Sequence, residues 1–149
     1  MTLTRRQALG LSASAAAFLA FGSKASFANA DATEAAIMEF TGGAMPGEGK
    51  VSLDTPEIAE NGNTVPVGVS IDSPMTDADH VVAVLILADG NPTPRVATFN
   101  FSTMSGSAEA KTRIRLAKTQ NVIAVAKMSD GSTFMDKKEV KVTIGGCGG

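Results

Sequence analysis

The sequence contains very few of the side chains from which most enzymes build a reactive centre. Its 149 residues include one Cys, one His, no Trp and no Tyr. A single Cys excludes an internal disulfide framework and any Cys-rich zinc site. A single His, His80, argues against a His-based metal cluster and against a triad of the Ser-His-Asp type. Few side chains of this sequence could therefore form a reactive centre.

The sequence also carries little net charge. Its 13 basic and 15 acidic side chains leave a formal charge of −2 at pH 7, which argues against a nucleic-acid-binding protein. Apolar residues make up 44% of the chain, which is too many for a disordered protein. The length suits one ordinary domain and is too short for two. We therefore expect a single small folded domain.

The first thirty residues have the order of an export signal. Arg5 and Arg6 stand together near the start, and an apolar run over residues 8–21 follows them. The tripeptide Ala-Asn-Ala at residues 28–30 then supplies a cleavage site of the A-x-A type. The adjacent arginines resemble a twin-arginine signal, a bacterial export route. Residues 1–30 are thus predicted to be removed, and the protein is expected in the periplasm.

The alternative for this segment is a membrane-anchoring helix. Its apolar run of about 14 residues falls short of the roughly 20 that a spanning helix needs. We therefore expect a mature form outside the membrane, produced by cleavage after Ala28 or after Ala30. The signal holds basic residues and no acidic ones, so its removal leaves the mature chain more acidic.

Most of the mature chain has the period-two pattern of β-strands, in which apolar and polar side chains alternate. The segments that alternate or are continuously apolar are residues 65–71, 81–87, 97–101, 113–117, 122–128 and 140–144, with a weaker candidate at residues 51–53. The turn dipeptides between them are Asn61-Gly62, Asp89-Gly90 and Asp130-Gly131. A short helix over residues 32–40 and a Gly-rich loop over residues 42–49 precede these strands.

Six or seven short strands in about 100 residues predict an all-β fold, a two-sheet sandwich of the immunoglobulin-like type. A barrel is the alternative. The domain is expected over residues 31–144, with a short N-terminal helix and a flexible C-terminal arm. The runs at residues 81–87 and 122–128 are apolar on both faces. They are either central strands of the sandwich or strands whose outer face is covered by a second protein chain.

The chain ends in Gly145, Gly146, Cys147, Gly148 and Gly149, which include its only thiol. Glycine has no side chain and opens the whole backbone map, so residues 145–149 are predicted to form a thin, flexible arm. Cys147 lies three residues past Ile144, where the last alternating strand ends, and can reach roughly 10 Å from that anchor. Such an arm could thread a narrow channel in another protein and present its sulfur there.

Nothing in the sequence indicates that Cys147 is activated. Activated cysteines lie at helix N-termini or beside cationic side chains, and the nearest cation in sequence is Lys141, six residues back. A tail cannot supply the pocket that the nucleophile of a self-contained enzyme needs. Cys147 is therefore interpreted as a handle that other enzymes modify. No catalytic residue and no metal site are predicted in this chain.

Other interpretations of the tail stay open. A Gly-rich end is commonly a disordered terminus without a role. Cys147 is alternatively the intermolecular disulfide link of a binding or scaffold module. A small cupredoxin-like electron carrier is disfavoured because the single His and the single Cys lie far apart in sequence. His80, which precedes an apolar run, is interpreted as a strand-edge or surface histidine.

Beyond these patterns, the sequence resembles the SoxY family, the sulfur-carrier subunit of the Sox thiosulfate-oxidising system. Its terminal Val-Thr-Ile-Gly-Gly-Cys-Gly-Gly, residues 142–149, matches the carrier arm of that family without departure. The other segments that carry the resemblance are residues 73–75, 80–81, 91–94, 112–117, 122–126 and 130–132. The resemblance therefore covers essentially the whole mature chain.

The resemblance implies a function and a set of partners. Cys147 would carry S-thiosulfonate and persulfide-type sulfur covalently, on a swinging arm made of Gly145, Gly146, Gly148 and Gly149. The chain would form a heterodimer with SoxZ, and the folded pair would cross the membrane together. A haem c enzyme, SoxAX, would couple thiosulfate to the thiol, and a dimanganese hydrolase, SoxB, would release sulfate. In some organisms a molybdenum–haem dehydrogenase, SoxCD, would oxidise the remaining sulfane sulfur. The metals and haems belong to these partners, so the chain is expected to bind no cofactor and to be a carrier, not an enzyme.

Overall fold

A computed structural model describes residues 28–146 of the chain. The twin-arginine motif at Arg5 and Arg6 and the terminal residues 147–149 lie outside the described residues. The elements are, in order, helix α2 (Ala28–Thr41), strands β1 (Val51–Asp54), β2 (Ile58–Asn61), β3 (Val65–Ile71), β4 (Val81–Ala88) and β5 (Arg95–Asn100), the short 3-10 helix η1 (Thr103–Ser105), and strands β6 (Glu109–Ile114), β7 (Gln120–Met128) and β8 (Thr133–Ile144).

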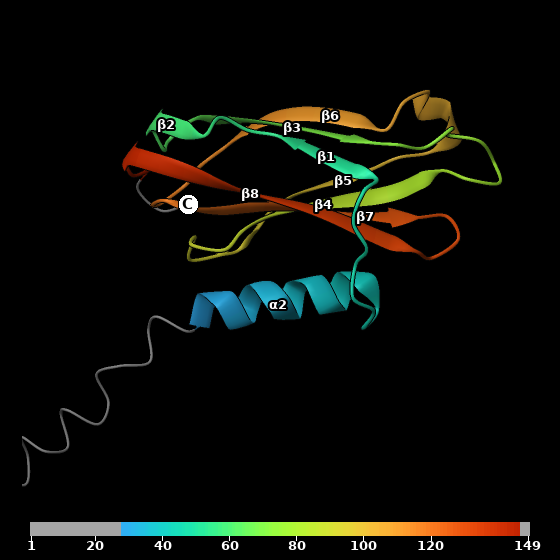
Figure 1. Cartoon of the computed structure of the whole chain (residues 1–149), viewed down its shortest axis with the longest axis horizontal. Helices are drawn as coiled ribbons and strands as arrows, with labels where there is room; N and C mark the ends of the chain where they lie inside the picture. The colour runs from blue at the N-terminus through green and yellow to red at the C-terminus, as the bar shows by residue number, and fades with distance from the viewer. Residues whose placement is uncertain (1–27, 147–149) are drawn as a thin grey trace, which may run out of the picture.

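The strands form two sheets that pack face to face (Figure 1). One sheet has three strands in the order β1-β3-β6, and the other has five in the order β2-β8-β7-β4-β5. Neighbouring strands are antiparallel except β2 and β8, which run parallel. Two separate sheets confirm the predicted sandwich and exclude the barrel alternative.

The core lies between the inner faces of the two sheets. Leu53 and Val65 from the smaller sheet and Val84 and Val122 from the larger one are fully buried there. The sheets are also joined along one side, because the backbone N–H of Leu53 in β1 donates to Oδ2 of Asp136 in β8 at 2.9 Å. This bond satisfies a donor on the open edge of β1 that no strand pairs.

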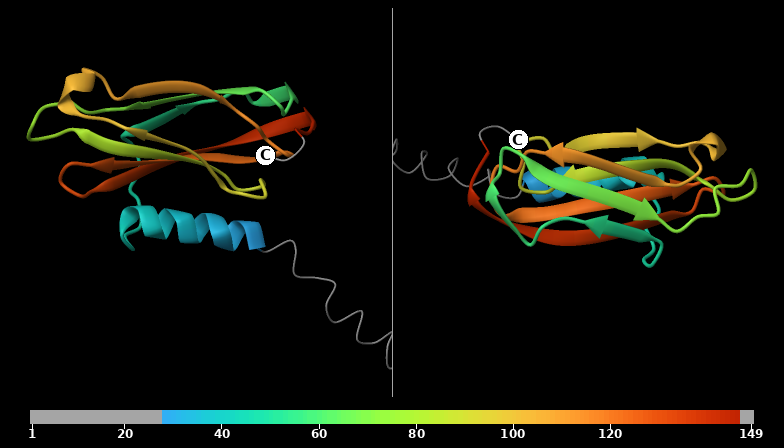
Figure 2. Two further views of the ribbon diagram at one scale, coloured as in Figure 1. Left: turned by 180° about the vertical axis from the view of Figure 1, so that it is seen from behind. Right: turned by 90° about the horizontal axis from the view of Figure 1, so that it is seen from above.

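Helix α2 covers the outer face of the five-stranded sheet (Figure 2). Ala36 packs against Leu85 and Leu87 of β4 and Ile123 and Val125 of β7, all of them buried. These two strands are apolar on both faces because one face meets the other sheet and the second face meets the helix. The strand order places both inside the larger sheet, which confirms the central-strand interpretation, and the chain's own helix provides the outer cover.

The start of α2 and the end of β8 lie at the same end of the sandwich (Figures 1 and 2). The β7–β8 turn, which contains the predicted dipeptide Asp130-Gly131, lies at the opposite end. Ser132 donates two hydrogen bonds to the carboxylate of Asp130, from its backbone N–H and its hydroxyl, and these hold the pKa of Asp130 below its ordinary value. Among residues 28–146, no helix is long and apolar enough to cross a membrane.

Some predicted boundaries differ from those in the structure. The helix begins at Ala28 and ends at Thr41, instead of spanning residues 32–40. The strand expected at residues 113–117 ends at Ile114, because there the chain leaves the smaller sheet and crosses to β7 in the larger one. Strand β2 was missing from the sequence prediction. It has four residues, of which only Ala59 is buried, so no alternation marks it.

We expect Leu85→Ala to lower the free energy of unfolding by about 2–5 kcal/mol, because it removes a side chain enclosed between sheet and helix. Val82→Ala on the same strand is the matched control. Val82 is 40% exposed, and its truncation should change stability by no more than about 0.5 kcal/mol. Urea unfolding of both variants checks this. Equal small losses would contradict the packing of α2 on this face.

Candidate functional site

The place where the chain leaves the sandwich is the end of β8. There β2 runs beside β8 in parallel register, with Ala59 opposite Val142 and Asn61 opposite Ile144. Two side-chain hydroxyls add to this pairing. Thr119 accepts a hydrogen bond from the N–H of Val142 at 2.9 Å, and Thr143 donates to the carbonyl of Ala59 at 3.2 Å. Strand β2 and the loop before β7 therefore secure β8 up to its last residue.

Beyond β8, three backbone hydrogen bonds join three segments that are far apart in sequence. The N–H of Gly62 donates to the carbonyl of Ile144 at 2.8 Å, and the N–H of Leu116 donates to the carbonyl of Gly62 at 2.8 Å. The N–H of Gly146 then donates to the carbonyl of Leu116 at 2.9 Å. We call these three bonds the backbone clasp. They hold the last described residue of the chain against the sandwich.

The clasp leaves no room for side chains at its glycines. A Cβ on Gly62 would lie 2.7 Å from the nitrogen of Gly146, and one on Gly146 would lie 2.8 Å from the carbonyl oxygen of Gly62. A Cβ on Gly145 would collide with the carbonyl oxygen of Ala117. Real Cβ atoms essentially never approach backbone this closely. Glycine at these positions is therefore required by close backbone approach.

The structure places two of the five predicted arm residues. Gly145 and Gly146 lie against the loop at residues 116–117, whereas Cys147, Gly148 and Gly149 lie outside the described residues. The anchor of the arm is consequently Gly146, one residue before the thiol, and not Ile144, three residues before it. The flexibility predicted for the arm stays a prediction.

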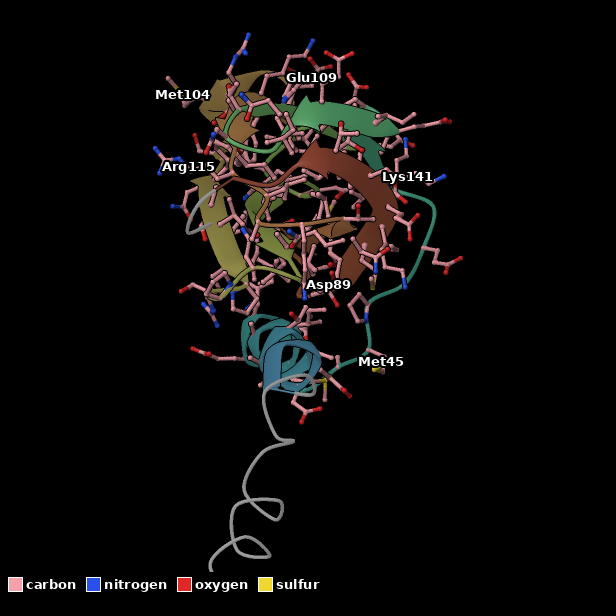
Figure 3. The ribbon with its side chains drawn as sticks, turned by 90° about the vertical axis from the view of Figure 1, so that its left-hand side faces the viewer. Met45, Asp89, Met104, Glu109, Arg115 and Lys141 are labelled. Carbon is pink, nitrogen blue, oxygen red and sulfur yellow. The ribbon has the colours of Figure 1, made fainter. Side chains whose placement is uncertain are left out.

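The clasp also brings a second cationic side chain near the point where the chain leaves the sandwich, which we call the exit. In sequence the nearest is Lys141, but the bond from Gly146 to Leu116 brings in Arg115, the neighbour of Leu116. Figure 3 looks onto this end of the molecule, with Arg115 and Lys141 on opposite sides of it and Asp89 toward α2. Arg115 and Lys141 are both exposed. Sequence distance could not reveal Arg115 as a neighbour, because Arg115 lies 29 positions before Ile144, the last residue of β8.

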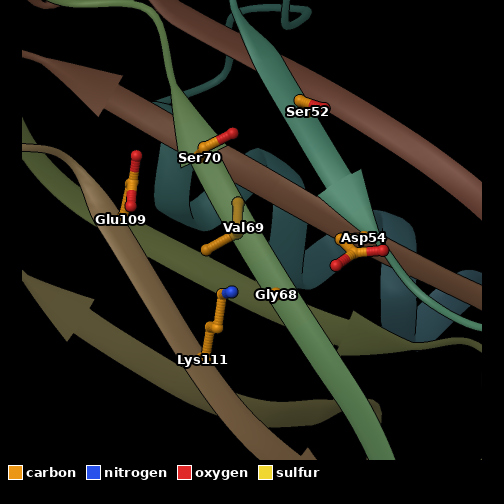
Figure 4. Close-up of a pocket in the computed structure, with 7 residues that line it drawn as sticks. All are labelled: Ser52, Asp54, Gly68, Val69, Ser70, Glu109 and Lys111. Carbon is orange, nitrogen blue, oxygen red and sulfur yellow. The ribbon is translucent and has the colours of Figure 1, made fainter.

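Other parts of the described chain offer no comparable site. His80 lies at the opposite end of β4 from the exit, where its Nδ1 is 2.9 Å from the carbonyl oxygen of Thr76, as expected for a strand-edge histidine. Among residues 28–146, no three His, Cys, Asp or Glu side chains are grouped to hold a metal ion. A shallow pocket on the outer face of the smaller sheet is lined by polar side chains, including Asp54, Glu109 and Lys111 (Figure 4).

Comparison with known proteins identifies the family. The family model described as sulfur oxidation protein SoxY matches residues 37–147. The chain belongs to the SoxY family. A solved structure of the sulfur carrier protein SoxY from Chlorobium limicola f thiosulfatophilum is 34% identical, with a TM-score of 0.62, and the match covers 77% of this chain and 99% of that one. These matches confirm the family resemblance and the sandwich fold inferred from the sequence.

More distant structures share the fold alone. The superoxide reductase (neelaredoxin) from Ignicoccus hospitalis is 17% identical, with a TM-score of 0.55 over 63% of this chain and 80% of that one. The superoxide reductase from Nanoarchaeum equitans is 13% identical, with a TM-score of 0.54 over 64% of this chain and 99% of that one. No curated protein matches the chain. The SoxY sandwich is thus an architecture that other proteins use as well.

We expect Gly62→Ala to lower the free energy of unfolding by about 1–3 kcal/mol, because the new methyl group overpacks the clasp. Gly68→Ala in β3 is the matched control. A Cβ at Gly68 meets nothing closer than 3.3 Å, at the Cβ of Asp54 in a side chain. Chemical denaturation of the two variants measures the difference. Equal stabilities would show that the clasp tolerates a side chain.

Proposed function

We propose that the chain is a covalent sulfur carrier, with Cys147 as the attachment site. The observation that carries this proposal is the family match, which extends to residue 147 and so includes the only thiol. The clasp supports it, because a firm anchor at Gly146 fixes the origin of the thiol-bearing end. The protein holds sulfur intermediates for other enzymes and does not itself turn over a substrate.

The loading step joins thiosulfate to the thiol by oxidation. Cys147–SH and thiosulfate, ⁻S–SO₃⁻, form Cys147–S–S–SO₃⁻ and release one proton and two electrons, which a partner haem c enzyme of the SoxAX type accepts. In a partner of the SoxB type, water then adds to the sulfonate sulfur and the S–S bond to that sulfur breaks. Sulfate and two protons are released, and the persulfide Cys147–S–S⁻ remains. A SoxCD-type dehydrogenase, where present, oxidises the remaining sulfane sulfur. Gly148 and Gly149 keep the end of the chain thin enough to enter each active site, while Gly145 and Gly146 permit the close backbone approach at the clasp.

Export and assembly complete the proposal. Residues 1–30, with Arg5 and Arg6, form a twin-arginine signal that directs the protein to the periplasm, and residues 31–144 form the carried domain. The chain pairs with SoxZ, and the folded pair is exported together. The protein binds no metal or haem of its own, because the redox and hydrolytic steps belong to the enzymes that visit it.

We expect Cys147→Ser to abolish thiosulfate-dependent respiration while leaving folding and pairing intact. Serine keeps the size of the side chain and removes the sulfur nucleophile. Intact mass spectrometry of the wild type from thiosulfate-grown cells should show a reductant-labile sulfur adduct on Cys147. A free or only disulfide-linked Cys147, together with normal respiration in the variant, would instead favour the scaffold interpretation.

We expect Gly146→Val to slow enzymatic loading about tenfold or more, because the side chain cannot fit beside Gly62 and displaces the anchor of the thiol. Loading kinetics with purified partner enzymes measure this. Alkylation of Cys147 by iodoacetamide serves as the internal control and should proceed at the wild-type rate. Unchanged loading would show that the position of the anchor does not matter.

A further inference from the structure

Two buried amide side chains, Asn91 and Gln120, lie behind the backbone clasp. Asn91 is 1% exposed and Gln120 is 5% exposed, so both are almost completely removed from water. Asn91 follows the Asp89-Gly90 turn after β4, and Gln120 begins β7. Buried amides must find hydrogen-bond partners, and the partners here belong to the segment that receives Gly146.

Asn91 binds the two peptide groups on either side of Leu116. Its Nδ2 donates to the carbonyl of Arg115 at 2.8 Å, and its Oδ1 accepts from the N–H of Ala117 at 3.0 Å. In an extended chain, the N–H and C=O of one residue point to one edge and those of its neighbours point to the other. Asn91 therefore occupies one edge of this segment, and the N–H and C=O of Leu116 face the opposite edge, toward Gly62 and Gly146.

Gln120 fixes the orientation of the Asn91 amide. Its Nε2 donates to Oδ1 of Asn91 at 2.9 Å and to the carbonyl of Lys118 at 3.0 Å, and its Oε1 accepts from the N–H of Gly90 at 2.7 Å. Oδ1 of Asn91 thus receives two donors, so a flipped amide would place its NH₂ group against both of them. A Cβ on Gly90 would lie 2.8 Å from the Cβ of Gln120, so glycine is required there as well.

We propose that Asn91 and Gln120 are positioning residues for the C-terminal thiol. The two amides fix the position of residues 115–117. Because the carbonyl of Leu116 then accepts the N–H of Gly146, the chain leaves the sandwich at one fixed point. The functional consequence rests on the carrier role proposed above, since Cys147 directly follows Gly146 in sequence and an enzyme that loads it must approach that anchor. The positional claim itself depends only on contacts among described residues.

The test compares three variants, each in the full protein as purified from cells. Asn91→Asp is nearly isosteric, but it puts a carboxylate oxygen in place of the Nδ2 that donates to Arg115. Gln120→Met keeps the volume of the side chain and removes its hydrogen bonds. Asn100→Asp is the matched control, because Asn100 is exposed on β5. NMR-detected hydrogen exchange reports the protection of the Gly146 amide, normalised to the amide of Val125 in the same sample so that a general loss of stability cancels.

We expect the relative protection of the Gly146 amide to fall about tenfold in Asn91→Asp and in Gln120→Met, and to stay unchanged in Asn100→Asp. Loading of Cys147 with thiosulfate by the partner haem enzyme should slow in the first two variants, while alkylation by iodoacetamide keeps its rate. Unchanged protection of Gly146 in folded Asn91→Asp or Gln120→Met would overturn the proposal, as would unchanged loading. If the wild type itself takes up no sulfur, the carrier function fails, and the exchange result still decides the positional claim.

Discussion

The backbone clasp at Ile144, Gly62, Leu116 and Gly146 is the constraint that determines where the carboxyl end of the chain leaves the sandwich. Two of its three hydrogen bonds join Gly62 to Ile144 and to Leu116, and the third holds Gly146 against Leu116. A side chain at Gly62 or Gly146 would collide with this backbone. The clasp thus fixes the backbone up to Gly146, one residue before the thiol in sequence.

Strand positions were largely predictable, because burial on one face imposes alternation and burial on both faces imposes apolar runs. Strand β7 shows this clearly, since its inner face meets the core and its outer face meets α2. Strand β2 was not predictable, because Ile58 points outward and a parallel pairing with β8 leaves no local pattern. The clasp could not be predicted from the sequence for a related reason. Residues 62, 116 and 146 are far apart in sequence and meet only in the folded structure.

Two of the predicted turn dipeptides have a second role that sequence alone could not assign. Asn61-Gly62 and Asp89-Gly90 are turns, as predicted, but Gly62 and Gly90 are also needed where backbone or side chain approaches too closely for a Cβ. The segments at residues 91–94 and 112–117 resembled the family without an evident purpose. The structure brings them together around Leu116, at the exit of the chain.

The shared location of the start of α2 and the end of β8 has a practical consequence. A fusion partner or affinity tag joined directly before α2 would lie at the same end of the sandwich as the end of β8. Attachment to a solid support or a fluorophore is better placed on the Asp130-Gly131 hairpin, at the far end of the sandwich.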